Sequence, residues 1–171
     1  DDIRAIDPQA GARSNVIVGF PGETEDDLSE LEAFLDRARL DAVGVFAYSD
    51  EEGTEAAGLD GKVPPEVIAA RVERISSLAA ELMNQRAEDR ADSVVDVLVE
   101  QVGDVDRDGA AVFGRAAHQG PDSDGCTTVL GVPRASSTGT GAVVPVGSFV
   151  RARVVEADGV DLVARFSDGP W

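Results

Sequence analysis

The hydrophobic pattern of the sequence changes its period near residue 90, and this change constrains the possible folds more than any other feature. Before it, two continuous apolar runs at residues 15–20 and 42–48 flank a segment with apolar residues at helical spacing. After it, apolar residues occur in short runs that Gly- and Asp-rich turns separate. The pattern predicts an α/β part followed by an all-β part, with a boundary at residues 90–92.

Residues 15–48 are predicted to form a strand–helix–strand unit. Continuous apolar runs of this length are typical of strands that are covered on both faces. Pro21 and Gly22 end the first run, and Thr24 stands in the N-cap position of a helix with an acidic first turn. Because the crossover of such a unit joins parallel strands of one sheet, we expect the two runs to pair in parallel.

A long amphipathic helix is predicted to start at Pro64 and Pro65 and to reach about Arg90, since proline is tolerated in a first turn. Apolar residues recur along it at steps of three and four, which gives one apolar face: Ile68, Val72, Ile75, Ala79 and Leu82. The opposite face is polar. We therefore expect the helix to bury one side, on the outside of the parallel sheet, and residues 63–91 to link the two parts.

Five short β-type runs after the helix predict a small antiparallel β-barrel or sandwich over residues 92–171. The runs cover residues 93–100, 110–115, 127–132, 148–155 and 160–166. Residues 133–147, between the third and the fourth run, are predicted to form a low-complexity loop. Strands of this length and spacing are typical of such folds. Residues 104–109 begin like a calcium-binding loop, but Arg115 stands where a bidentate glutamate is needed, so we expect a hairpin turn.

The charge of the chain favours basic partners over nucleic acid. The sequence has 33 acidic and 15 basic residues and a net charge of -18, and acidic residues lie in both parts. Nucleic-acid affinity depends largely on Lys and Arg that neutralise phosphates, so RNA binding is not expected of the all-β part. Complementary charge steers a basic partner instead, although a role in solubility alone stays open.

The cysteine content excludes a disulfide framework within these residues. Cys126 is the single cysteine, which suits a reducing compartment, and no apolar stretch is long enough to span a membrane, so a cytoplasmic location is expected. An iron–sulfur cluster needs several thiolate ligands, and one cysteine does not supply them. His118 is the single histidine and is predicted to be a loop residue.

Two segments carry motifs that point to a ligand site. They are residues 14–25 (SNVIVGFPGETE) and residues 43–49 (VGVFAYS) followed by residues 52–54 (EGT). The Gly-Phe-Pro-Gly turn follows a strand, so it lies where barrels of strands and helices hold their chemistry, and its glycines let a ligand approach the backbone. Both segments resemble the late strands of the radical-SAM barrel in the methylthiotransferase family, in their usual order and separation.

Later segments are similar to one branch of that family, whose members modify a ribosomal protein. The helix with Arg71 and residues 84–86 stands where the family joins its barrel to a C-terminal TRAM module. The positions similar to the module of this branch are residues 114–115, 121–125 and 161–162. Gly120 and Ser123 depart from it, since the branch usually has an alanine and a hydrophobic residue there.

The resemblance implies the C-terminal part of a radical-SAM (β/α) barrel at residues 1–62, a linking helix at 63–91 and a TRAM-like β-barrel at 92–171. It implies a transferase that, when intact, methylthiolates an aspartate of the twelfth small-subunit ribosomal protein. The implied cofactors are S-adenosylmethionine and two 4Fe-4S clusters, and the TRAM module recognises the basic protein. With one cysteine, the chain alone is expected to be inactive. Two alternatives stay open: a tRNA-modifying methylthiotransferase, and a non-catalytic acidic module that docks on a basic partner.

Five residues are expected to contact S-adenosylmethionine, because the late strands of radical-SAM barrels lie beside it. They are Gly19, Pro21, Gly22, Phe46 and Tyr48. Without the resemblance, the first three would be an ordinary strand-ending turn and the two aromatic residues would be core residues. Asp122 and Asp124 are expected to bind the substrate protein, with an Asx-rich turn as the alternative. No catalytic or metal-binding residue is expected in the chain.

Overall fold

The computed structural model describes residues 2–7, 9–106, 109–121, 124–133 and 144–167. They fall into two compact units, one formed by Ala12–Met83 and the other by Asp1–Gly11 together with Asn84–Trp171. Each unit has its own hydrophobic core. The division of the chain at residues 62 and 91 that the sequence suggests stays a prediction.

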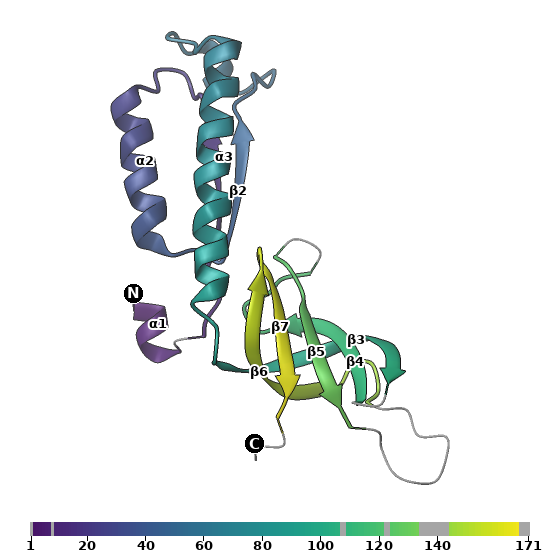
Figure 1. Ribbon diagram of the computed structural model, residues 1–171. Helices are drawn as coiled ribbons and strands as arrows, with labels where there is room; N and C mark the ends of the chain where they lie inside the picture. The colour runs from purple at the N-terminus through teal and green to yellow at the C-terminus, as the bar shows by residue number, and fades with distance from the viewer. Residues whose placement is uncertain (1, 8, 107–108, 122–123, 134–143, 168–171) are drawn as a thin grey trace. The chain divides into compact units, whose positions relative to one another are not determined.

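The unit Ala12–Met83 contains a two-stranded parallel sheet and helical connections (Figure 1). β1 (Arg13–Val18) pairs with β2 (Ala42–Ala47) in parallel along its whole length, as the sequence predicts. The connection is α2 (Glu25–Ala38), and a short 3-10 helix, η1 (Ala56–Gly58), follows β2. α3 (Pro65–Glu88) comes next. No helix in the described part of the chain is long and apolar enough to cross a membrane.

The core of this unit forms between the sheet and the two long helices. Side chains alternate between the faces of a strand, so Val16 and Val18 of β1 point to the same side as Val43 and Val45 of β2. These residues pack against Ile75 of α3 and against Leu28 and Leu35 of α2. Val18, Leu28, Leu35 and Ile75 are at most 1% exposed. The predicted apolar face of α3 is therefore the face that the sheet and α2 cover.

The opposite face of the sheet is uncovered among the described residues. Ile17 of β1 is 59% exposed and Phe46 of β2 is 54% exposed. The prediction that both faces of these strands are covered is therefore wrong for the described structure. The reason is that α2 and α3 both pack on the face that carries Val18, and the described part of this unit places nothing over the other.

α2 begins at the N-cap that the sequence predicts. Thr24 Oγ1 accepts a hydrogen bond of 3.2 Å from the Asp27 N–H, and Asp27 Oδ2 accepts one of 2.8 Å from the Thr24 N–H. This reciprocal pair is a capping box, which satisfies two backbone donors at the start of the helix. At the other end, Arg39 takes a left-handed conformation with φ of 49°, which ends the helix.

Replacing Thr24 by alanine is expected to destabilise α2 by about 1 kcal/mol, because the Asp27 N–H then loses its acceptor. Hydrogen bonds from the backbone and then the side chain of Thr24 hold the pKa of Asp27 below its ordinary value of 3.8. The carboxylate therefore adds stability above pH 3.8, and this contribution is lost as the pH falls through the lowered pKa. Amide hydrogen exchange of α2 at neutral and acid pH measures both effects. Ser29→Ala keeps the capping box and serves as the control, so equal losses in both variants would count against the box.

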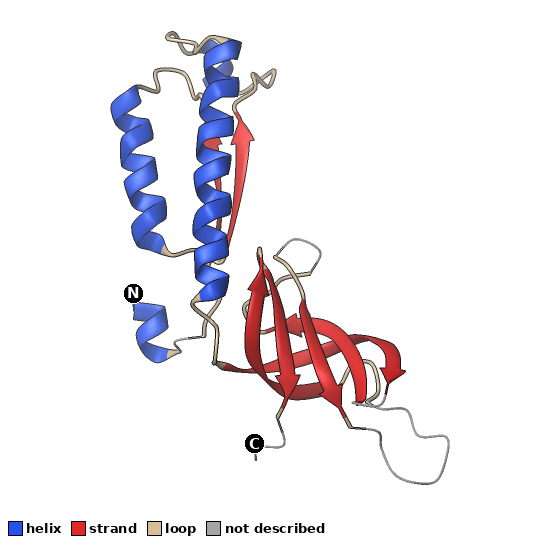
Figure 2. Ribbon diagram, in the orientation of Figure 1, coloured by secondary structure: helices blue, strands red, loops and turns tan. Residues whose placement is uncertain are grey.

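The second unit contains a closed five-stranded barrel, which confirms the predicted all-β part (Figure 2). The strands follow one another around the barrel in the order β3-β4-β5-β7-β6. Their bounds are β3 (Val94–Asp106), β4 (Gly109–Ala116), β5 (Thr127–Val132), β6 (Phe149–Asp158) and β7 (Asp161–Phe166). A short helix, α1 (Asp2–Ile6), also belongs to this unit.

One pairing of the barrel departs from the antiparallel arrangement predicted from the sequence. β5 and β7 pair in parallel, from Thr127↔Leu162 to Leu130↔Arg165, whereas the other four pairings are antiparallel. The reason is geometric. Strand directions cannot alternate at every step around a ring with an odd number of strands, so a closed barrel of five strands must contain a parallel pair.

The barrel interior is filled by small and β-branched side chains. Val97, Val112, Val129 and Val154 are completely buried, together with other inward-facing residues of the five strands. The pairing Asp106↔Gly109 joins β3 to β4 as a hairpin, as predicted for the segment that begins like a calcium-binding loop. The flanking elements are strands, whereas an EF-hand loop lies between helices.

Candidate functional site

The segment from Gly19 to Glu23 forms a tight turn at the carboxyl end of β1. Gly19 is buried with φ of +89°, and a Cβ there would lie 2.6 Å from Ile68 Cγ1 of α3, so the position requires glycine. Gly22 also has a positive φ, of +87°, but a Cβ there would meet nothing within 4 Å. Its N–H donates to the Gly61 carbonyl at 2.9 Å. The turn is thus anchored under α3 at its start and open at Gly22.

Aromatic side chains lie at the same ends of the strands. The rings of Phe20 and Tyr48 pack edge to face, with centroids 5.3 Å apart. The Tyr48 N–H donates to the Val18 carbonyl at 2.8 Å, which continues the β1–β2 pairing past β2. Phe46 is 54% exposed, so it is not a core residue. Gly22, Phe46 and Tyr48 are therefore accessible from outside the core, whereas Gly19 and Pro21 are buried.

A charged pair holds the hydroxyl of Tyr48. Tyr48 donates a 2.7 Å hydrogen bond to Asp50 Oδ1, and Lys62 Nζ pairs with the same oxygen. Lys62 also donates to the Ala56 carbonyl at 2.8 Å and lies 5.4 Å from the centre of the Tyr48 ring. The hydrogen bond to Asp50 raises the pKa of Tyr48, and Lys62 lowers the pKa of Asp50. At neutral pH the site therefore presents a neutral phenol beside a compensated ion pair.

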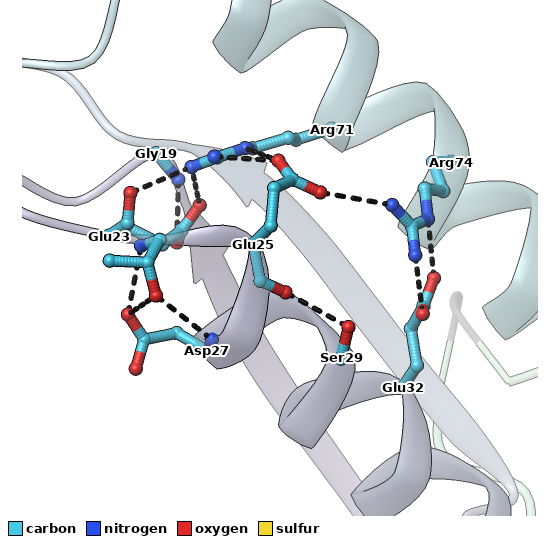
Figure 3. A network of polar contacts seen from close by, with 9 residues as sticks. Gly19, Glu23, Glu25, Asp27, Ser29, Glu32, Arg71 and Arg74 are labelled. Atoms are coloured by element: carbon cyan, nitrogen blue, oxygen red, sulfur yellow. Dashed lines mark hydrogen bonds and ion pairs between the residues drawn. The ribbon is translucent and has the colours of Figure 1, made fainter.

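A network of ion pairs connects the turn to both long helices (Figure 3). Glu23 Oε2 accepts a 2.9 Å hydrogen bond from the Gly19 N–H, and Glu23 Oε1 pairs with Arg71 Nη1 at 2.8 Å. Arg71 also donates to the Glu23 carbonyl and, through Nε and Nη2, to Glu25 Oε1 in the first turn of α2. The side chains of Arg71 and Glu23 are only 10% and 12% exposed.

Arg74 lies one turn further along α3 and belongs to the outer part of the network. Its guanidinium meets both carboxylate oxygens of Glu32 at 2.6 Å, and Nη1 lies 3.3 Å from Glu25 Oε2. The Arg74 side chain is 48% exposed. Arg74 thus joins α3 to α2 without touching the Gly19–Glu23 turn.

The described residues contain no group of three His, Cys, Asp or Glu side chains that is able to hold a metal ion. Cys126 lies before β5, where its N–H donates to Asp161 Oδ1 at 2.7 Å. Partial desolvation and the neighbouring Asp161 raise the pKa of the Cys126 thiol, so it is protonated at neutral pH. The residues of this chain do not fit a 4Fe-4S cluster, because such a cluster is held by several thiolates.

Of the two aspartates predicted to bind substrate, the structure describes one. Asp122 lies outside the described residues. Asp124 is 7% exposed, and its Oδ2 accepts a 2.8 Å hydrogen bond from the Gly120 N–H, which is a turn-stabilising contact. His118 lies in the turn after β4, as predicted, and is buried there. Contact of Asp122 or Asp124 with a substrate stays a prediction.

Several residues of the candidate site were missed by sequence reasoning. They are Phe20, Glu23, Asp50, Lys62 and Arg71. Phe20 and Glu23 lie inside the turn motif at residues 14–25, so the motif itself indicates that they are close to the site. Arg71 and Lys62 lie far along the chain from the turn, and only the packing of α3 and the loop before it brings them there.

Comparison with known proteins identifies relatives of the chain along most of its length. Residues 93–166 match the TRAM domain family, and this segment is the closed barrel. The chain is 60% identical over 164 residues to a protein of Kineococcus radiotolerans and 58% identical over 165 residues to one of Saccharopolyspora erythraea. Each alignment covers 96% of the chain, and each relative is named ribosomal protein uS12 methylthiotransferase RimO.

The chain is shorter than these relatives. It spans about a third of the length of the curated relatives it matches, 32% of the first and 31% of the second. A relative from Cutibacterium acnes with the same name is 53% identical over 96% of the chain. These findings confirm the resemblance predicted from the sequence: the chain carries a TRAM domain and is similar along nearly its whole length to a C-terminal portion of the RimO methylthiotransferases.

Proposed function

We propose that the chain is a C-terminal portion of an enzyme that methylthiolates an aspartate of ribosomal protein uS12. The observation that carries the proposal is the 60% identity over 96% of the chain to a protein named for that activity. In the proposed enzyme, the unit Ala12–Met83 contributes to the binding of S-adenosylmethionine and the TRAM barrel binds the protein substrate. The thiolates for the clusters are supplied from outside this chain, since Cys126 is alone.

The residues at the carboxyl ends of β1 and β2 fit S-adenosylmethionine. Gly22 offers backbone with free space where a side chain would stand, so a ligand is able to approach it closely. Phe46 on β2 provides an exposed ring on the uncovered face of the sheet, suited to stacking or apolar contact with a nucleoside. Tyr48 adds a neutral hydroxyl with a fixed orientation. S-adenosylmethionine would supply the radical chemistry of this family, and these residues would orient it.

The charges of the barrel support a protein substrate rather than RNA. Arg151 on β6 forms a two-pronged contact with Asp96 on β3, at 2.8 and 3.0 Å. Arg115 on β4 pairs with Glu100 on β3 at 2.6 Å. Arg115 and Arg151 thus each have a carboxylate partner, which reduces the positive potential that would attract a phosphate backbone.

The proposal is tested on the full-length gene product, purified anaerobically and incubated with S-adenosylmethionine, sulfide and a one-electron reductant. The expected result is binding of S-adenosylmethionine in equilibrium dialysis and a methylthio mass gain on one aspartate peptide of purified uS12. Transfer to a tRNA while uS12 stays unmodified would move the protein to the tRNA-modifying branch. Binding of uS12 without any uptake of S-adenosylmethionine would favour the non-catalytic module.

Phe46→Ala and Phe34→Ala form a matched pair for the cofactor surface. Both side chains are about half exposed, at 54% and 47%, but Phe34 lies on α2 and Phe46 on the uncovered face of the sheet. Phe46→Ala is expected to weaken S-adenosylmethionine binding about tenfold, since an aromatic contact of a bound ligand is lost. Phe34→Ala is expected to change it by less than about twofold. Equal dissociation constants for both variants would remove Phe46 from the site.

A further inference from the structure

We propose that Arg71 is a positioning residue that holds the Gly19–Glu23 turn in its ligand-binding conformation by acting through Glu23. The identity of the ligand rests on the proposed function, but the positioning does not. Among the hydrogen bonds of the described residues, those from Arg71 to the turn go to Glu23, at 2.8 Å to the side chain and at 3.1 Å to the backbone carbonyl. Its role is therefore distinct from that of the residues proposed to contact S-adenosylmethionine.

The two oxygens of the Glu23 carboxylate have different partners. Oε2 accepts the Gly19 N–H and so closes the turn on itself, whereas Oε1 faces Arg71. At 12% exposure the carboxylate has little access to water, so its charge depends on the guanidinium. Without Arg71, the carboxylate lowers its energy by turning toward solvent, which releases the Gly19 N–H. The backbone of the turn then loses the contact that fixes its width.

Arg71 is suited to this task because its own position is fixed. Its Nε and Nη2 both donate to Glu25 Oε1, at 3.1 and 2.8 Å, while Nη1 serves Glu23. The planar guanidinium thus fixes the Arg71 side chain between the turn and the start of α2. On the other side, Ile68 of α3 fills the space against Gly19. The helix therefore controls the turn at two points, through one apolar and one charged contact.

The test compares Arg71→Gln with Arg74→Gln in the full-length gene product. Both changes remove an arginine from α3 that pairs with Glu25, but Arg74 does not touch the turn. Arg71→Gln is expected to speed amide exchange of Gly19 about tenfold and to weaken S-adenosylmethionine binding by a similar factor. Arg74→Gln is expected to change either quantity by less than about twofold. Arg71→Lys keeps a positive charge beside Glu23 but lacks the planar guanidinium. It is therefore expected to show smaller changes than Arg71→Gln in both Gly19 exchange and S-adenosylmethionine binding.

The two readouts separate this inference from the proposed function. If Gly19 exchange is unchanged in Arg71→Gln, Arg71 does not position the turn, whatever the protein binds. Equal effects of Arg71→Gln and Arg74→Gln would reduce the role to joining α2 and α3, and would also overturn the proposal. If the parent protein takes up no S-adenosylmethionine, the proposed function fails, while faster exchange at Gly19 in Arg71→Gln alone still supports the positioning role.

Discussion

The Gly114→Ala variant is expected to lose the folded barrel, with a cost of about 4 kcal/mol or more. Gly114 on β4 pairs with Val99 on β3 and with Thr127 on β5. A Cβ at this position would lie 1.9 Å from the Leu98 carbonyl oxygen. The obstacle is backbone, so no change of side-chain rotamer relieves it, and the pairing of β3 with β4 must open. Such a cost is a large fraction of the total stability of a domain of this size.

Amide hydrogen exchange resolved along the chain is the measurement for Gly114→Ala. Protection is expected to fall in all five barrel strands, while β1, α2 and the start of α3 keep theirs, because the two units have separate cores. Gly58→Ala is the control, since a Cβ at Gly58 meets nothing within 4 Å. Native protection of the barrel in Gly114→Ala would show that β3 and β4 move apart at little cost.

Ile75→Ala is expected to destabilise the unit Ala12–Met83 by about 2–5 kcal/mol. Ile75 lies in the middle of α3, is completely buried, and packs in the cluster with Val18, Leu28 and Leu35. Its removal leaves a cavity at the point where the sheet meets both long helices. Because a two-stranded sheet has little stability of its own, the unit has few other contacts with which to compensate.

Chemical denaturation followed by amide exchange measures the loss in Ile75→Ala. Ser77→Ala, on the exposed side of the same helix, is the control and is expected to stay within about 0.5 kcal/mol of the parent. Protection of the barrel strands provides an internal reference in the same sample. A loss confined to the barrel would contradict the assignment of Ile75 to this core.

Most of the fold follows from local patterns in the sequence. The apolar runs and the Thr24 cap predict β1, α2 and β2, because both depend on residues close along the chain. The five short runs predict the five barrel strands for the same reason. The parallel pairing of β5 with β7 was missed, since runs and turns do not show which strands close a ring. The exposure of Ile17 and Phe46 was missed because an apolar run does not reveal what covers it.

The candidate site was predicted less completely than the fold. The turn motif and the aromatic positions at the end of β2 are visible in the sequence, and the structure packs Tyr48 against Phe20 of the turn and leaves Phe46 exposed on β2. The contacts of Glu23 and Lys62 depend on long-range packing that no local pattern encodes. Asp124 was predicted to bind the substrate, with an Asx-rich turn as the alternative, and its side chain accepts the Gly120 N–H within its own turn. Polar residues in turns are often used in this local way.

The parallel pair that closes the barrel has a consequence for synthesis of the protein. In the described barrel, β7 follows the other four strands along the chain and bridges β5 and β6. A nascent chain that has reached β6 therefore holds an open sheet with two unpaired edges, which are templates for aggregation. At a translation rate of about 5–20 residues per second, synthesis from the end of β6 at Asp158 to the end of β7 at Phe166 takes about a second. Pairing of β7 with both edges thus converts a vulnerable intermediate into a ring without edges, so a chain cut short between β6 and β7 would be prone to aggregate.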